Sequence, residues 1–585
     1  MRLLLLLVPI GIIFGQSAEL CPRPAPGATV QAPMDQRSSN GTLTVDFSLR
    51  TNVDVYGLTV YCYVYGDGVQ SPTLRVNPGD ELVLRLKNEL PAPSAGADTR
   101  MHQHSAELNS CGSGPLTASS TNLHFHGLNV PPTCHQDDVI HTLIQPDDAA
   151  FEYRIKIPDN EPPGLYWYHP HPHGFSEAQV LGGASGALIV EGIEHVNPAV
   201  AALPERVLVL RDQFIGGVVE NAKGDGDEPY IPSLDISLNY VPVLYPLYQP
   251  AVMLVRPGQR EFWRVLNAAA DTFFNLQLLY WPDPDTQVAQ PMQVIAIDGV
   301  PVGTDYAAVQ RTSILLPPGA RAEFLMTTPP EGMYAQFLTQ SYDNGPFGDT
   351  DNYRVLANIK STKAAPPAPG VAPNTPASLE PQRFSSLTSV APAEQRKLYF
   401  SETFQDPTDP TSPASYFITV EGATPKVFDM NFKTPDITVT QGTVEDWTIE
   451  NRAQEAHAFH IHQLHFQLIE RDGQPVDEPV LRDTVDLPYW DGKSATYPSV
   501  KLRMDFRDPN IIGTFLYHCH ILEHEDGGMM GSIEVVAPAS ADQDPSRQNP
   551  ASRHTRAADR GISGQLGISG LWKREDEDGA DQEKR

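Results

Sequence analysis

Histidines are clustered along this chain in a pattern that suits metal binding. The sequence has 18 histidines in 585 residues, a density that gives about half a His-x-His pair by chance, yet six such pairs are present. Alternate residues of a strand project to the same face, so each pair would present two imidazoles to one small volume. We therefore predict a histidine-rich metal site.

Four segments carry most of these histidines, two in the first third of the chain and two near its end. They span residues 123–127, 167–174, 457–462 and 518–529. A site built from all four would lie where the two ends of the folded chain meet. Metal would then hold the outer domains together.

The cysteines divide into a candidate metal ligand and four candidate disulfide partners. Cys519 lies between His518 and His520, where a thiolate suits a metal better than a disulfide. Export would allow two disulfides among the others. Cys111 with Cys134 is the better pairing because these residues bracket one short segment, although sequence alone leaves the connectivity open. The remaining two are Cys21 and Cys62.

Short strands are expected to position these residues. The 43 glycines and 55 prolines, set among short apolar runs, favour many strands joined by turns and predict an all-β chain. Alternation is clear in 41–66 and 72–90. Similar turns at 77–80, 256–259 and 440–443 each precede a strand-like run, so one β-sandwich unit is expected to recur three times.

The length suits three domains with additional segments at the ends. The expected organisation is a signal peptide at 1–18, domains at 40–195, 200–362 and 394–537, a Pro- and Ala-rich linker at 363–393, and a disordered charged tail at 538–585. The middle domain contributes no recognised ligand and is expected to act as a spacer that lines part of the substrate approach.

Charge and hydropathy limit the location and the partners. A net charge of −31 argues against nucleic acid as a partner, because phosphate binding relies on clustered Lys and Arg. The apolar run 3–14 after Arg2 is typical of a secretory signal, which is cleaved or kept as an anchor. No later stretch is apolar enough to predict stable membrane insertion. The protein is expected to be secreted or periplasmic.

The order and spacing of the four histidine segments resemble those of the multicopper oxidases. The order is His-x-His-Gly, His-x-His, His-x-x-His-x-His and His-Cys-His-x-x-x-His-x-x-x-x-Met. The resemblance covers about residues 40–537 and is to three-domain laccase-type members, with a last segment similar to the bacterial spore-coat laccase and copper-efflux oxidase branch. It implies three cupredoxin-like Greek-key β-sandwich domains and four copper ions, one of type 1, one of type 2 and a type 3 pair.

The resemblance also implies a role for each ligand. The type 1 or blue site would use His457, Cys519, His524 and Met529, which supply two imidazoles, a thiolate and a weak axial ligand. Type 2 copper would use His124 and His460. The type 3 pair would use His126, His169, His171, His462, His518 and His520. If these segments are strands, the two sites separate by strand parity, since His460 and His462 face opposite to His457.

Dioxygen reduction consumes protons, so acids near the copper cluster are expected to relay them. Glu525 and Asp137 match positions where the family keeps an acid, with Asp138 as the alternative to Asp137. His173 and His465 extend the ligand segments, but the family pattern gives them no metal, so they are expected to support the ligands or to be ordinary polar residues.

The implied activity is the one-electron oxidation of a reductant coupled to the four-electron reduction of dioxygen to water. The favoured reductants are phenols, aromatic amines or similar molecules, with electrons entering at an exposed edge of His524 or His457. The alternative is a metallo-oxidase acting on Cu(I), Fe(II) or Mn(II); the absence of a Met-rich segment disfavours Cu(I). An electron carrier would not need the additional imidazoles, and a nitrite reductase is disfavoured by the type 3 ligands and the length.

Overall fold

The computed structural model describes residues 20–92, 111, 115–215, 232–302, 309–371, 384, 387–406, 412–476 and 480–538. The expected signal peptide at 1–18 lies outside these ranges, and so do residues 539–585 of the expected tail and much of the linker. Strands dominate the described chain, and the helices are short. The prediction of an all-β chain is therefore confirmed. The helical segments are α1 (Ser176–Leu181), α2 (Ile193–Val196), α3 (Leu522–Asp526), η1 (Pro198–Val200), η3 (Leu387–Ser389) and η4 (Pro509–Ile511).

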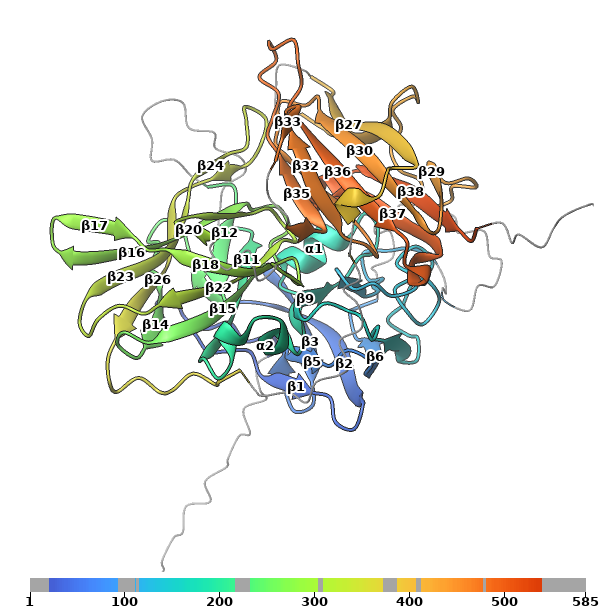
Figure 1. Cartoon of the computed structure of the whole chain (residues 1–585). Coiled ribbons are helices and arrows are strands. Elements are labelled where there is room, and N and C mark those ends of the chain that lie inside the picture. Colours follow the sequence, from blue (N-terminus) through green and yellow to red (C-terminus); the bar gives the residue numbers. More distant parts are fainter. Residues whose placement is uncertain are drawn as a thin grey trace, which may run out of the picture. The chain divides into compact units, whose positions relative to one another are not determined.

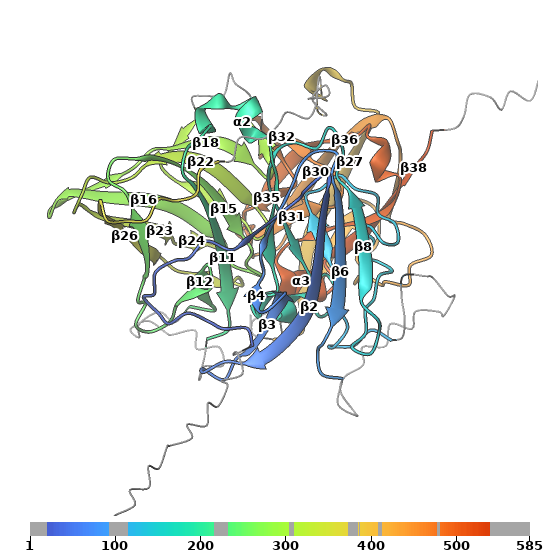
Figure 2. The same cartoon turned by 90° about the horizontal axis from the view of Figure 1, so that it is seen from below.

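The first sandwich consists of two sheets drawn in blue to teal (Figure 1). In hydrogen-bonded order, one sheet contains β4 (Val69–Gln70), β3 (Thr59–Tyr65), β2 (Thr42–Val53), β6 (Glu81–Asn88) and β8 (Phe151–Lys156). Figure 2 shows β2, β6 and β8 side by side. The other contains β1 (Asp35–Arg37), β5 (Thr73–Val76), β10 (Gly186–Val190), β9 (Gly164–His169) and β7 (His124–His126). The second sheet thus ends on a histidine-bearing strand.

The second sandwich, drawn in green, lies between β11 and β26 in sequence. One sheet contains β13 (Val241–Val243), β12 (Asp235–Leu238), β11 (Glu205–Gln213), β15 (Arg260–Asn267), β22 (Arg321–Thr327), β18 (Met292–Ile297) and β19 (Val300–Pro301), with β20 (Gln310–Arg311) on β18. The other contains β14 (Ala251–Val255), β26 (Arg354–Ser361), β23 (Tyr334–Gln340), β16 (Phe274–Asp283) and β17 (Thr286–Ala289), with β21 (Ile314–Leu316) on β16. A separate ribbon pairs β24 (Tyr342–Asp343) with β25 (Thr350–Asp351).

The third sandwich, drawn in yellow to red, carries the remaining histidine segments (Figure 1). One sheet contains β28 (Ala414–Val420), β27 (Glu394–Phe404), β30 (Thr443–Asn451), β36 (Ser499–Phe506), β32 (Phe466–Arg471) and β33 (Gln474–Pro475), with β34 (Leu481–Arg482) on β32. The other contains β29 (Ile437–Thr440), β38 (Met530–Val536), β37 (Gly513–Cys519), β31 (His457–Ile461) and β35 (Thr484–Leu487). The central strands β31 and β37 are the ones that carry ligands.

The recurring turn has the same structural role in each sandwich. Gly79, Gly258 and Gly442 all have a positive φ, a conformation that side-chain-bearing residues rarely adopt. Each turn leads into a strand that pairs in parallel with the first long strand of its sandwich, as β6 does with β2, β15 with β11 and β30 with β27. The apolar alternation of these strands fills three separate cores. Repetition of one sandwich unit, expected from the turns, is seen directly.

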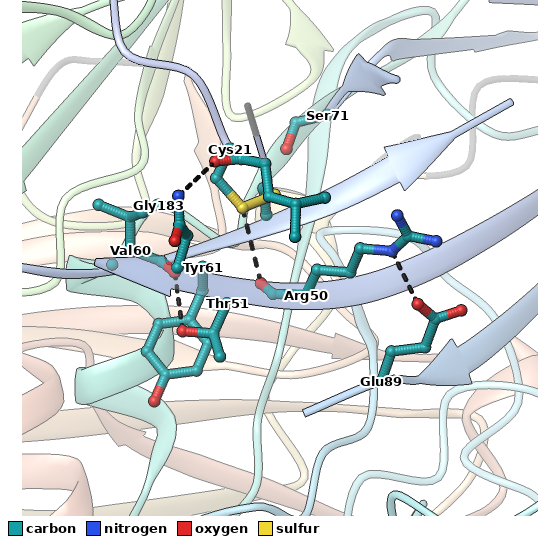
Figure 3. Close-up of a disulfide and its surroundings, with 12 residues drawn as sticks. Cys21, Arg50, Thr51, Val60, Tyr61, Ser71, Glu89 and Gly183 are labelled. Atoms are coloured by element: carbon teal, nitrogen blue, oxygen red, sulfur yellow. Dashed lines mark hydrogen bonds and ion pairs between the residues drawn. A yellow bond between two sulfur atoms is a disulfide. The ribbon is translucent and has the colours of Figure 1, made fainter. Parts of the chain in front are cut away.

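Two disulfides tie loops and the N-terminal segment to the first sandwich. Cys21 is bonded to Cys62 of β3, and Cys111 is bonded to Cys134. Figure 3 shows the first of these beside β2, where Arg50 forms an ion pair of 2.8 Å with Glu89. The favoured pairing of Cys111 with Cys134 is confirmed. Among the described residues, no helix is long and apolar enough to cross a membrane.

Candidate copper centres

Two pairs of strands, one from each outer sandwich, position the histidines. In the first sandwich β7 pairs with β9, which sets His124 opposite His169. In the third sandwich β31 pairs with β37, which sets His460 opposite His518. Cross-strand neighbours lie close enough for their side chains to meet. Each sandwich therefore presents a compact set of imidazoles to the other.

These imidazoles form three groups in which the ligand atoms lie within 4.8 Å of one another. Each group draws on both outer sandwiches, and all of the members are buried. The groups are His124, His126 and His460; His126, His169 and His520; and His171, His462 and His518. Sequence and family resemblance named all eight histidines, and the structure brings all eight together.

Contacts between rings show how closely the two sandwiches meet. The rings of His124 and His462 stack with centroids 4.0 Å apart, and those of His126 and His460 stack at 3.9 Å. The Nε2 atom of His518 in the third sandwich lies 3.4 Å from that of His171 in the first. Imidazole nitrogens that come this close from different strands are placed to bind the same metal ion.

The donor atoms fit copper because several of them have no other partner. In the described part of the chain, buried imidazole nitrogens without a hydrogen-bond partner include His124 Nε2, His126 Nδ1, His169 Nε2, His460 Nε2, His462 Nδ1 and both nitrogens of His520. Leaving buried polar atoms unpaired costs free energy, and a bound metal would remove that cost. Burial also lowers the pKa of five of these imidazoles, which favours the neutral form that ligates metal; the five are His126, His169, His460, His462 and His520.

A fourth group has the composition of a blue copper site. Cys519 Sγ lies 3.6 Å from His457 Nδ1 and 3.7 Å from His524 Nδ1, and those two nitrogens are 3.1 Å apart. The thiol is free and buried. Met529 is fully buried in the same core, and its backbone N–H donates to the His524 carbonyl at 2.8 Å. The three expected ligands are thus together, and Met529 lies close to them along the chain.

Strand parity separates this group from the imidazole cluster, as expected from the sequence. On β31, His457 joins Cys519 whereas His460 joins the imidazole cluster. On β37 and just after it, His518 and His520 lie in the cluster while Cys519 between them faces the blue site. Successive residues of a strand point to opposite faces, so a few residues serve two sites.

The two expected acids both lie against the imidazole cluster. The two carboxylate oxygens of Asp137 are each 3.0 Å from His124 Nδ1, and one also accepts the Phe125 backbone N–H. Asp138, the alternative, instead contacts His141 at 3.0 Å. The geometry therefore favours Asp137.

Glu525 reaches two histidines of one group. Its oxygens lie 3.5 Å from His171 Nδ1 and 3.3 Å from His518 Nδ1. The side chain is fully buried, and burial raises the pKa of this carboxyl well above its usual range. A buried carboxyl in this position can hold a proton next to the cluster.

The exposed histidine edge expected for electron entry is absent from the structure. His457 and His524 are 0% and 1% exposed. The ring of Tyr416 stacks on that of His524 with centroids 4.4 Å apart, and Phe400 packs against His457 at 4.8 Å. The expectation was wrong because spacing along the chain carries no information about which other strands cover a ligand.

Carboxylates face the outer nitrogens of both blue-site histidines. Glu402 Oε1 lies 3.7 Å from His457 Nε2, and Glu455 Oε1 lies 3.4 Å from His524 Nε2. Burial, together with repulsion from Glu455, raises the pKa of Glu402 to about 8. Sequence reasoning missed both acids, because Glu402 is far from the ligands in sequence and nothing distinguishes Glu455 from a surface acid.

The other two histidines of the ligand segments are buried beside the clusters. The ring of His173 meets that of Phe428 edge to face, and His465 Nε2 lies 2.8 Å from the Asp298 carbonyl oxygen. Neither belongs to a metal-ligating group among the described residues. Both positions are compatible with the expected supporting role.

Comparisons with known proteins agree with this geometry. Family models described as multicopper oxidase match residues 116–195 and 401–539, the two segments that contain all of the predicted ligands. A multicopper oxidase of Staphylococcus haemolyticus is 25% identical, with 81% of this chain and 83% of that protein covered. A laccase of Bacillus stratosphericus is 23% identical, with 81% and 90% covered.

A solved structure of a multicopper oxidase from Campylobacter jejuni, described as a metallo-oxidase, superposes with a TM-score of 0.60 at 24% identity, covering 88% of this chain and 96% of that one. The predicted fold class of cupredoxin-like sandwiches is thereby confirmed. These findings show two multicopper oxidase segments in the chain and a similarity over most of its length to copper-dependent oxidoreductases of that family.

Proposed function

We propose that this protein is a laccase-type oxidase that binds four copper ions and couples the one-electron oxidation of small reductants, such as phenols or aromatic amines, to the reduction of dioxygen. Four electrons and four protons convert one dioxygen to two waters, so four reductant molecules are consumed in each cycle. The observation that carries the proposal is the meeting of three imidazole groups beside a Cys-His-His group. Similarity to the laccase of Bacillus stratosphericus supports the class of reductant.

The ligand sets are taken from the family pattern, and the grouping of the side chains supports them. His457, Cys519, His524 and Met529 would hold the blue copper; His124 and His460 would hold the type 2 copper. His126, His169 and His520 would hold one copper of the type 3 pair, and His171, His462 and His518 the other. Copper in these positions would supply one-electron redox chemistry between the reductant and dioxygen.

Cys519 provides the electron route between the two sites. It is covalently bonded through the backbone to His518 and to His520, and these two histidines belong to different groups of the imidazole cluster. The path therefore runs through bonds from the thiolate to both sides of the cluster. Tyr517, the residue before His518, is buried in the third core and keeps this strand fixed.

Proton delivery is assigned to Glu525 and Asp137. Glu525 would hold a proton beside the Nδ1 atoms of His171 and His518 and release it toward the space between the groups. Asp137 contacts His124 Nδ1 and would both orient that ring and accept or return a proton. Neither acid needs to move far, since each already lies against a ligand.

Copper content and oxygen uptake test the proposal directly. We expect about four coppers per chain, an intense blue absorption band and phenol-driven oxygen consumption, because the ligand sets provide one thiolate site and three imidazole sites. The measurements are elemental analysis, visible spectroscopy and an oxygen electrode on the same sample. About one copper with no oxygen uptake would leave an electron carrier and refute the oxidase.

A metal ion is the second candidate reductant, and the carboxylates at the blue site favour it. Glu402 and Glu455 face the outer nitrogens of the two histidines through which electrons would enter. Oxygen ligands suit Fe(II) or Mn(II) better than Cu(I). Burial of both histidines also hinders direct contact with an aromatic reductant. Similarity to the Campylobacter jejuni metallo-oxidase is in line with this candidate.

Carboxamide variants separate the two reductant classes. Glu402→Gln and Glu455→Gln each replace a carboxyl oxygen that could bind a cation next to His457 or His524, while keeping side-chain size. If metal ions are the reductant, oxidation of Fe(II) or Mn(II) should fall about 10-fold or more, because each variant loses a carboxyl oxygen that could bind the cation. Steady-state oxygen uptake with each reductant measures the effect. Equal changes with a phenol and with the metal ions would contradict the metal-ion candidate, and Glu534→Gln on β38 serves as the control.

We also propose limits for the three domains and export of the protein. The expected limits 40–195, 200–362 and 394–537 lie close to the sheet boundaries, since β10 ends at Val190, β11 begins at Glu205, β26 ends at Ser361 and β27 begins at Glu394. Export, with removal of residues 1–18, is supported by the two disulfides, because such bonds persist in oxidising compartments. Sequencing of the mature N-terminus tests the cleavage.

A further inference from the structure

A turn of the middle sandwich lies directly against the imidazole cluster. It joins β21 (Ile314–Leu316) to β22 (Arg321–Thr327) and includes Gly319, whose φ is +86°. A Cβ atom on Gly319 would lie 2.8 Å from His520 Nε2 and 3.1 Å from His126 Cε1. The first distance is shorter than real Cβ contacts and the second is tighter than most of them, so glycine lets this turn approach two rings of the same group.

Arg321, two residues later, connects all three sandwiches. Its side chain is 0% exposed. The two terminal nitrogens donate to the two carboxylate oxygens of Asp483 at 2.7 Å each, and Nε donates to the Leu165 carbonyl of β9 at 3.1 Å. One terminal nitrogen also donates to the Gly319 carbonyl at 3.1 Å. A two-point pair of this kind fixes the orientation of the carboxylate as well as its position.

Asp483 in turn contacts the cluster from the third sandwich. Its Oδ1 atom lies 3.1 Å from His126 Nε2, and its backbone carbonyl lies 2.8 Å from His460 Nδ1. Thr484 donates its hydroxyl to the same Oδ1 atom at 2.9 Å. Asp483 therefore touches one imidazole from each outer sandwich, and these two are the rings that stack at 3.9 Å.

We propose that Arg321 is a positioning residue for copper, acting through Asp483 on His126 and His460, and that Gly319 provides the space the rings need. Hydrogen bonds from non-ligand groups fix the orientation of ligating imidazoles. The middle sandwich, which supplies no ligand, then forms one wall of the cluster. Among the contacts of the described residues, none joins Arg321 or Asp483 to His457, Cys519 or His524. Copper binding at the blue site should therefore not depend on the pair of Arg321 and Asp483.

Arg321→Met and Arg321→Lys should both retain copper in the imidazole cluster less well than the wild type. Copper in the imidazole cluster should be lost to a chelator about 10- to 100-fold more readily in Arg321→Met, since this is the usual effect of removing a group that orients ligands. Arg321→Lys, which keeps the charge but not the two-point geometry, should show a smaller loss. The measurements are copper per chain, the type 2 electron paramagnetic resonance signal and the near-ultraviolet absorption of the type 3 pair, with the blue band as internal reference.

Arg264→Lys is the matched control for loss of a buried arginine. Arg264 belongs to the same sandwich, is 0% exposed and pairs with Glu205 and Glu323, with no copper-site histidine among its described partners. It should retain cluster copper as the wild type does. Equal copper loss in the Arg264 and Arg321 variants, or a blue band that falls in parallel with the cluster signals, would show a general structural role and overturn the proposal.

Two further comparisons separate positioning from folding. Gly319→Ala should lose the type 3 signature, whereas Gly442→Ala, at a turn with a comparable φ of +97° and open space around it, should not. Asp483→Asn combined with Arg321→Met should retain no less copper than Asp483→Asn alone, because both changes break one path. If the copper losses of the two single variants instead add up in the double variant, Arg321 does not act through Asp483. Absence of copper in the wild type would instead refute the proposed function, so the two failures are distinguishable.

Discussion

Replacement of Cys519 by serine should abolish the blue band and the oxidase activity together. A serine hydroxyl is not ionised near neutral pH and cannot replace a thiolate as a copper ligand or as the first atom of the electron route. The imidazole groups do not use the sulfur, so copper should remain in the cluster. Visible spectroscopy, copper analysis and oxygen uptake on one preparation measure all three properties. Oxygen uptake should fall to the uncatalysed rate.

The matched control removes the Cys111–Cys134 disulfide with the same chemical change. Cys111→Ser with Cys134→Ser breaks a bond that lies outside every ligand group among the described residues. This double variant should keep its blue band even where its stability falls. A blue band that survived Cys519→Ser would mean that the thiolate ligand lies elsewhere, and the assignment of the blue site would be wrong.

The ligands were predictable from the sequence because they occur in short, local sequence patterns. His-x-His pairs depend on strand alternation. Because Cys519 lies between His518 and His520, these three consecutive residues contribute ligands to two different sites. The family resemblance then supplied the role of each residue. These features need no knowledge of how distant strands pack. The structure brings the predicted histidines and Cys519 into four groups, and Asp137 joins His124 and His462 in a fifth.

The residues around the ligands could not be predicted in this way. Arg321 and Asp483 are separated by 162 positions and meet only because β22 and the residue before β35 belong to sandwiches that pack together. Glu402 reaches His457 from β27 across 55 positions, and it covers a ring that was expected to be exposed. A single arginine, aspartate or glutamate carries no periodic pattern, so its partner is fixed by tertiary packing alone. The middle sandwich accordingly looked like a spacer although it contacts the cluster.

Replacement of Glu525 by glutamine should slow turnover by about 100-fold while leaving the coppers in place, since loss of a general acid typically costs 10²- to 10⁴-fold. The amide has nearly the same shape as the carboxyl and can stay near His171 and His518. It cannot deliver a proton, so reduction of dioxygen should slow even though electrons still arrive. Anaerobic bleaching of the blue band by reductant should therefore keep its wild-type rate, whereas its return on mixing with oxygen should slow.

Glu534→Gln is the matched control for this change. Glu534 lies on β38 in the same sandwich, is partly exposed and belongs to none of the metal-ligating groups. It should bleach and recover as the wild type does. If Glu525→Gln instead loses copper, or bleaches slowly without oxygen, the carboxyl holds the ligands in place and the proton relay must be assigned to Asp137. Unchanged recovery with full copper content would remove Glu525 from the mechanism, because its distance from the two histidines would then have no chemical consequence.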